Sequence, residues 1–123
     1  SKMVAFNGSI YVVTSSNGTY KPAIYRMDKD GNYTKIMDIT SGDRFNEVYR
    51  TNDIKVIDGK IVVLVNSGTK SYIVTSSDGT TWSSAVKMGS SGYISEIIGH
   101  NGYTYAGFYD YRVGTYVIKR ILN

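Results

Sequence analysis

The chain has 123 residues, a length typical of one folded domain. Hydrophobic residues make up 41% and charged residues 20%, a balance seen neither in disordered segments nor in membrane-embedded chains. The net charge is +4, but Lys and Arg are scattered along the chain, so no nucleic-acid partner is expected. No apolar run approaches the ~20 residues that cross a bilayer, so no membrane insertion is expected. Cysteine is absent, which excludes disulfides and thiolate metal sites.

The first expected unit covers residues 3–40 and contains four strands. Asn7-Gly8 and Asp30-Gly31 are pairs that favour the positive φ angles of hairpin turns, so each is expected to connect two neighbouring strands. The expected strands are Met3–Phe6, Ser9–Thr14, Ala23–Met27 and Tyr33–Ile39.

The second unit, residues 47–90, repeats this order with Asp58-Gly59 and Asp78-Gly79 as its turns. Its expected strands are Asp53–Ile57, Lys60–Asn66, Ser71–Thr75 and Trp82–Met88. Residues 61–65 are apolar at five consecutive positions, whereas a strand with one face in water would alternate. This run predicts a strand that is covered on both faces, either between two neighbouring sheets or in the centre of a two-sheet sandwich.

The third unit, residues 92–123, contains Asn101-Gly102 and has no fourth strand. Its expected strands are Ile94–Ile98, Tyr103–Tyr109 and Thr115–Leu122. Four-stranded repeats of ~40–50 residues are typical of propeller blades. The sequence therefore predicts one all-β domain over residues 1–123, built as a partial β-propeller of about three blade-like antiparallel repeats; a β-sandwich is the alternative.

The segment from Ser76 to Trp82, SSDGTTW, resembles an Asp-box, the Ser/Thr-x-Asp-x-Gly-x-Thr-Trp signature of sialidase-type propeller blades, with one residue fewer. A weaker copy without Trp occupies residues 28–33. In that family the motif is structural, so the resemblance implies a folding role for Ser76, Asp78, Gly79 and Trp82. The short polar side chains can accept hydrogen bonds inside the turn, Gly79 can adopt a positive φ, and Trp82 can pack beneath the hairpin.

The chain contains 12 tyrosines, and several of them fall in the third unit. Strand periodicity places Tyr103, Tyr105, Gly107 and Tyr109 on one face of the sheet. This face suits a platform on which a sugar ring stacks, and Tyr103, Tyr105 and Tyr109 are the candidate ligand-binding residues. It would also suit an oligomer interface, and the pattern is more often typical of ordinary packing between blades.

No catalytic residue, metal site or cofactor is predicted. A sialidase needs three arginines around a carboxylate, and no pattern selects three from Arg26, Arg44, Arg50, Arg112 and Arg120. His100 stands beside a turn, and the chain has no Gly-x-Ser-x-Gly nucleophile motif. The glutamates, Glu47 and Glu96, and the turn aspartates do not indicate the paired carboxylates of a glycosidase. The turn at 28–31 lacks the rest of an EF-hand calcium loop.

We therefore expect a non-enzymatic binding module whose ligand is a carbohydrate or a surface receptor. A structural assembly module and a fragment of a sialidase-like glycoside hydrolase are the alternatives. Propellers usually close with four to eight blades, so we expect a homo-oligomer or a part of a larger assembly. The Gly-, Asn-, Ser-, Thr- and Tyr-rich composition is similar to that of phage tail and other virion domains, which favours an extracellular or virion location.

Overall fold

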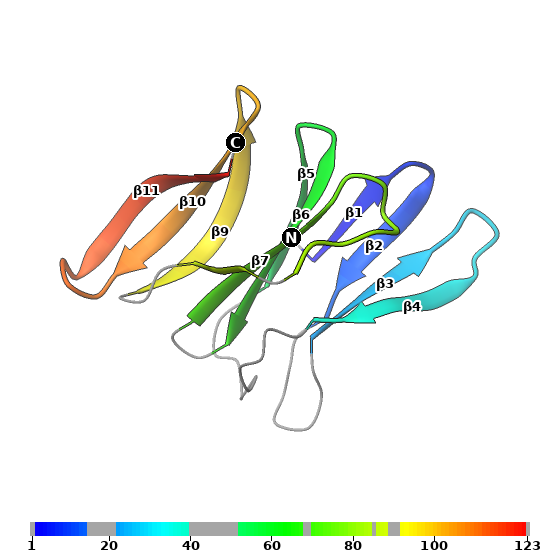
Figure 1. Ribbon diagram of the computed structural model, residues 1–123, viewed down its shortest axis with the longest axis horizontal. Helices are drawn as coiled ribbons and strands as arrows, with labels where there is room; N and C mark the ends of the chain where they lie inside the picture. Colours follow the sequence, from blue (N-terminus) through cyan, green and yellow to red (C-terminus); the bar gives the residue numbers. More distant parts are fainter. Residues whose placement is uncertain are drawn as a thin grey trace.

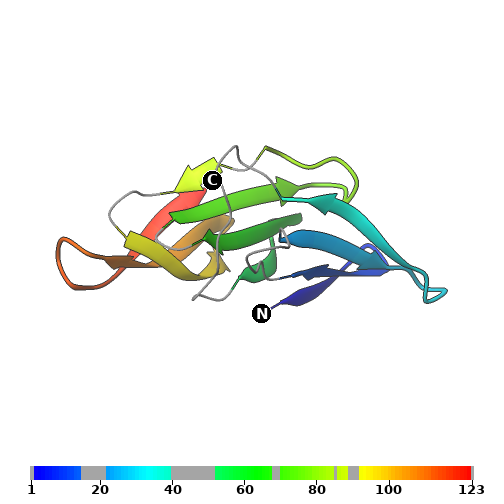
Figure 2. The same cartoon turned by 90° about the horizontal axis from the view of Figure 1, so that it is seen from below.

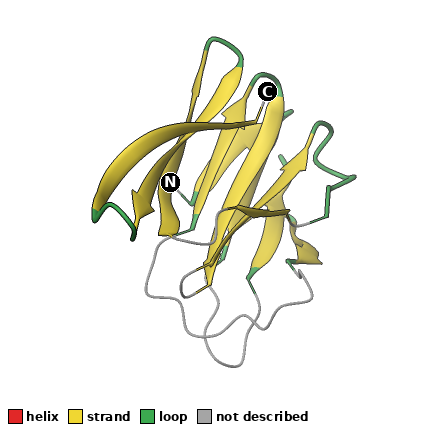
Figure 3. Cartoon of the chain, turned by 60° about the vertical axis from the view of Figure 1, so that its left-hand side comes forward, coloured by secondary structure: helices red, strands yellow, loops and turns green. Residues whose placement is uncertain are grey.

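The computed structural model describes residues 2–14, 22–39, 52–67, 70–84, 86–88 and 92–122. These ranges contain eleven β-strands and no helix (Figures 1 and 3). The all-β prediction is therefore confirmed for the part of the chain that is described. None of the described segments is a helix long and apolar enough to cross a membrane.

The strands form three separate antiparallel sheets, and each sheet is built from consecutive strands. The first sheet contains β1 (Met3–Phe6), β2 (Ser9–Val13), β3 (Ala23–Met27) and β4 (Tyr33–Asp38). The second contains β5 (Asp53–Ile57), β6 (Lys60–Ser67), β7 (Lys70–Ser76) and β8 (Val86–Met88). The third contains β9 (Gly92–His100), β10 (Tyr103–Asp110) and β11 (Thr115–Leu122). The predicted division into units of four, four and three strands thus agrees with the described strands.

The expected strand over Trp82–Met88 is wrong in its first half. Only Val86–Met88 pairs with β7, and Trp82–Ser84 is irregular. The N–H of Ser83 donates to the carbonyl of Thr75 at 2.9 Å, and the Ser83 hydroxyl accepts the N–H of Thr75. These bonds keep the chain close to β7 while the Asp78-Gly79 turn changes its direction.

Three of the Asx-Gly pairs, Asn7-Gly8, Asp58-Gly59 and Asn101-Gly102, make the predicted hairpin turns between the first two strands of each sheet. Asn7, Asp58 and Asn101 have φ angles of 49°, 52° and 52°, and the glycine after each has a φ between 73° and 80°. Two consecutive positive φ angles are the geometry of a type I′ turn, which matches the twist of the flanking strands. The repeated turn therefore sets the same strand register at the start of each sheet.

The three sheets follow one another in sequence order and pack face against face, with the second between the other two (Figures 1 and 2). Their first strands are neighbours: β1 contacts β5, and β5 contacts β9. The sheets are therefore held together by side chains that pack between their faces, with additional polar bonds at one end.

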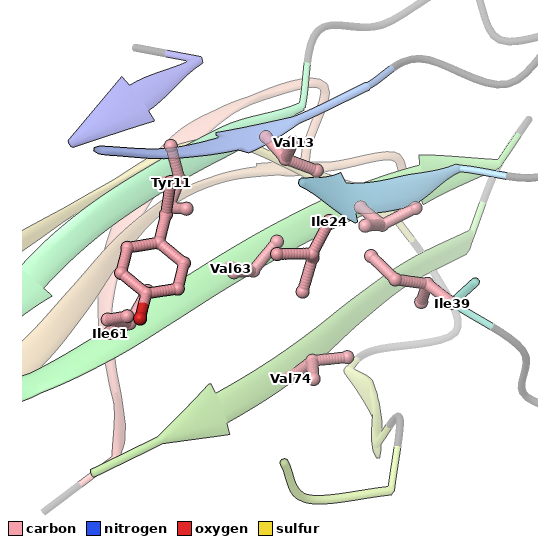
Figure 4. Packing of buried hydrophobic residues seen from close by; sticks show 9 residues of the cluster. Tyr11, Val13, Ile24, Ile39, Ile61, Val63 and Val74 are labelled. Carbon is pink, nitrogen blue, oxygen red and sulfur yellow. The ribbon is translucent and has the colours of Figure 1, made fainter. Parts of the chain in front are cut away.

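Two apolar clusters fill the spaces between the sheets. The first lies between the first and second sheets, where Tyr11 and Ile24 point toward Ile61 and Val63 (Figure 4). The second lies between the second and third sheets and contains residues such as Leu64 and Phe108.

Alternate residues of β6 enter different clusters: Ile61, Val63 and Val65 join the first, and Val62 and Leu64 join the second. The prediction that residues 61–65 are covered on both faces is confirmed. Because three sheets lie in series, the two-sheet β-sandwich does not describe this arrangement.

Buried polar side chains tie the second sheet to both neighbours. Asn66 donates to the carbonyl of Ile94 at 2.9 Å, and Ser71 accepts the N–H of the same residue. Asn52 donates to the carbonyl of Thr14 at 2.8 Å and accepts the N–H of Asn66. A buried polar group that loses its partner costs stability, so these bonds restrict how the sheets can slide.

Candidate functional site

The segment that resembles an Asp-box forms a compact turn at the end of β7. The Asp78 carboxylate accepts the N–H groups of Thr80 and Thr81 at 2.8 and 2.7 Å. The Ser76 hydroxyl accepts the N–H of Gly79 at 2.8 Å and donates to the same carboxylate. The N–H of Thr81, followed by that of Thr80, lowers the pKa of Asp78 because these donors favour the charged form.

Gly79 and Trp82 connect this turn to the first apolar cluster. Gly79 has a φ of 82°, and a Cβ there would collide with the Tyr11 hydroxyl. Trp82 is half-buried, packs against the cluster and lies 6.3 Å from the Tyr11 ring, measured between centroids. The four residues assigned a folding role therefore lie together in one hairpin, although its kinship with the Asp-box family stays a prediction.

The weaker copy at residues 28–33 uses its carboxylate in the same manner. Asp28 accepts the N–H groups of Asp30 and Asn32 at 3.0 and 2.9 Å, and Gly31 has a φ of 85°. The backbone donor of Asn32 is the main cause of the lowered pKa of Asp28. Tyr33 takes the place of the Trp, but it is 55% exposed and stacks on Tyr25 instead of entering the core. Among the described residues, no group of three acidic, His or Cys side chains gathers where it could hold a metal.

The predicted tyrosine face lies on the side of the third sheet that points away from the second sheet. Thr104, Ala106 and Phe108, which alternate with the tyrosines, are buried. Tyr103 lies beneath the Arg120 guanidinium, 4.7 Å from its ring centroid, and Tyr105 lies near His100. The structure therefore keeps the three candidate tyrosines on one face, but it gives each of them different neighbours.

Tyr109 belongs to a group of four rings, here called the tyrosine cluster, with Tyr93, Tyr111 and Tyr116. The Tyr109 centroid lies 5.5 Å from Tyr93, 5.6 Å from Tyr111 and 4.9 Å from Tyr116. The hydroxyls of Tyr93 and Tyr116 are 3.0 Å apart. Tyr111 and Tyr116 are 44% and 56% exposed, so part of the cluster is open to solvent.

Sequence reasoning missed Tyr93 as a member of this group. Tyr93 lies opposite Tyr109 in the register of β9 and β10, and Tyr116 lies opposite Tyr109 in the register of β10 and β11. A bulge near Gly107 shifts the first register, so counting residues back from the Asn101-Gly102 turn does not give this pairing.

An ion pair supports the turn that carries Tyr111. The Asp110 carboxylate accepts the backbone N–H of Arg112 at 2.9 Å and two guanidinium N–H groups at 3.3 Å. The Arg112 guanidinium, followed by its backbone N–H, lowers the pKa of Asp110. The Asp110 side chain is 6% exposed, so the carboxylate that accepts these bonds is largely shielded from solvent.

The other candidates do not converge on one site. Arg26 lies in the first sheet, whereas Arg112 and Arg120 lie in the third. His100 and Glu96 are exposed on β9. Arg44, Arg50 and Glu47 fall outside the described residues.

Comparison with known proteins gives a structural likeness only. No model of a protein family and no curated protein matches the chain. A xylan β-1,4-xylosidase from Bacillus halodurans C-125 superimposes with a TM-score of 0.61 at 14% sequence identity. The match covers 97% of this chain and 28% of the xylosidase chain, so this chain spans about a quarter of the length of its structural neighbour. At this identity the likeness shows a shared fold.

Replacing Trp82 by Ala is expected to lower the free energy of unfolding by about 3 kcal/mol, because the substitution removes a large ring from the first cluster. Urea unfolding followed by circular dichroism measures the loss. Tyr33→Ala, at the corresponding place in the exposed turn, is the matched control, with an expected loss of about 1 kcal/mol. Equal losses in the two variants would contradict the packing role of Trp82.

Asp78→Ala is expected to be destabilising at neutral pH and progressively less so in acid. The folded pKa of Asp78 lies below 3.8, so its stabilisation is fully present above that value and is lost as the pH falls through the folded pKa. Urea unfolding of both proteins across this range measures the difference. A difference that persists unchanged in acid would show that the charged carboxylate does not hold the turn.

Proposed function

We propose that the chain is a non-enzymatic module that binds carbohydrate through the tyrosine cluster, on a scaffold that forms part of a β-propeller. The scaffold proposal is supported by three sheets that follow one another in sequence order and contact through their first strands. The repeated type I′ turns give each sheet the same starting register. This arrangement is what consecutive propeller blades require.

The observation that carries the binding proposal is the grouping of four tyrosine rings on an exposed sheet face. A sugar ring has an apolar C–H face and a rim of hydroxyls, and it therefore needs flat apolar area together with hydrogen-bonding groups. Tyr111 and Tyr116 are partly exposed rings that carry hydroxyls, and Tyr93 and Tyr109 contact them edge-on or at a tilt. Tyrosine supplies such area at a small cost in side-chain entropy.

The surroundings of the cluster favour binding without catalysis. Hydrolysis of a glycosidic bond normally uses two carboxyl groups on either side of it. In the described part of the third sheet the carboxylates are Glu96 and Asp110, and Asp110 is occupied by Arg112. We also propose a location on a virion or cell surface, because the chain is rich in Gly, Asn, Ser, Thr and Tyr, as phage tail and other virion domains are. The alternative, a fragment of a glycoside hydrolase, is supported by the likeness to the xylosidase, and this likeness shows a shared fold.

The test is a glycan array probed with the purified chain, followed by calorimetry on any glycan that binds. Tyr116→Ala is expected to weaken binding about fivefold or more, since a stacked ring contributes on the order of 1 kcal/mol beyond its buried area. Tyr33→Ala, which removes an exposed and stacked tyrosine from the first sheet, is expected to bind normally. An array with no binding, or a glycan that binds Tyr116→Ala as tightly as the native chain, would refute the proposal.

A further inference from the structure

The third sheet exposes a face whose counterparts in the other two sheets are buried. We call the side of a sheet that points to the next sheet in sequence its leading face. On this face Ile24 pairs with Val13 in the first sheet, and Ile73 pairs with Leu64 in the second. Both isoleucines are core residues, 0% and 2% exposed.

Ile118 is the counterpart of these isoleucines in the third sheet. It pairs with Gly107, and Gly107, like Val13 and Leu64, is the fifth residue after the glycine of the Asx-Gly turn. Ile118 is nevertheless 82% exposed. The same position is buried in the core of the other two sheets. An exposed apolar residue at this position therefore indicates that the face packs against another surface.

The first sheet exposes the complementary side, which we call the trailing face because it points away from the next sheet. Ile61, the second residue after the turn glycine, is 0% exposed on the trailing face of the second sheet. Its counterpart Ile10 in the first sheet is 42% exposed. Ile54 is likewise 0% exposed, and its counterpart Met3 is 61% exposed.

We propose that the leading face of the third sheet binds the trailing face of the first sheet of a second copy of this chain, head to tail. The chain itself joins a leading face to a trailing face twice, between its first and second sheets and between its second and third (Figure 1). The two exposed end faces are the remaining halves of this same interface. A second copy therefore continues a packing mode that is already established in the molecule.

The known interfaces predict which residues meet between copies. In the first cluster Ile24 of the first sheet points toward Val63 of the second (Figure 4). The counterpart of Ile24 is Ile118, and the counterpart of Val63, the fourth residue after its turn glycine, is Val12. Ile118 of one copy is thus expected to pack against Val12 and its neighbour Ile10 in the next.

The tyrosine cluster lies beside Ile118 on the same face, since Tyr116 and Ile118 are two residues apart on β11. Tyr109 and Tyr116 correspond to Asn66 and Ser71, which in the second sheet bond to the backbone of Ile94 near the start of β9. The glycan array measures binding and the solution mass measures self-association, so either proposal can fail without the other.

Light scattering behind a sizing column tests the proposal through mass. The native chain is expected to give at least twice 13.6 kDa, and Ile118→Lys and Ile10→Lys are each expected to raise the dissociation constant at least tenfold. Val113→Lys is the matched control, because Val113 is a 65% exposed apolar residue in a turn. Circular dichroism checks that each variant folds, and Ile118→Thr, which keeps a good strand former, replaces the lysine variant if it does not.

Mixing the two lysine variants separates head-to-tail contact from other arrangements. Each variant keeps one intact face, so the mixture is expected to form dimers although neither variant does so alone. A dimer formed through the same face of both copies would be weakened by only one of the two substitutions, and mixing the variants would not restore the lost association. The proposal would be overturned by that result, by a native chain that stays at 13.6 kDa, or by association that neither substitution weakens.

Discussion

Face-to-face packing of the second sheet against two neighbours is the constraint on which the rest of the structure depends. Strand β6 directs Val63 to one side and Leu64 to the other, and both are completely buried. Burial of apolar area is the main favourable term in folding, and β6 gains it on both faces at once. The polar bonds of Asn66 and Asn52 then fix the sheets against sliding, since each buried group needs its partner.

This packing accounts for the contrast between the middle and the ends of the molecule. The end sheets are covered by their neighbour on one face only, and their other faces carry residues such as Ile10 and Ile118. On the third sheet the uncovered face is divided into two regions. The tyrosine cluster occupies the end near the β10–β11 turn, and the Ile118 region lies where the repeat places its core. We propose that the tyrosine cluster binds carbohydrate and that the Ile118 region binds a second copy of the chain.

Much of the scaffold follows from local patterns. The Asx-Gly pairs identify the turns because their φ angles are restricted, and the apolar run from Ile61 to Val65 reveals two-sided burial because a half-exposed strand would alternate. The start of β8 could not be predicted, since Trp82 leaves the sheet to pack against the first apolar cluster. Tyr93 was missed because a bulge shifts the pairing between strands, and a register of this kind depends on tertiary contacts.

The most direct test of the central claim is a methyl NOESY spectrum that maps the neighbours of Val63 and Leu64. Two-sided packing predicts contacts from Val63 to the first sheet, including Ile24, and from Leu64 to residues of the third sheet in the second cluster, such as Ile97 and Ala106. If both residues contacted the same neighbouring sheet, or if either lacked contacts to another sheet, the serial arrangement of three sheets would be contradicted.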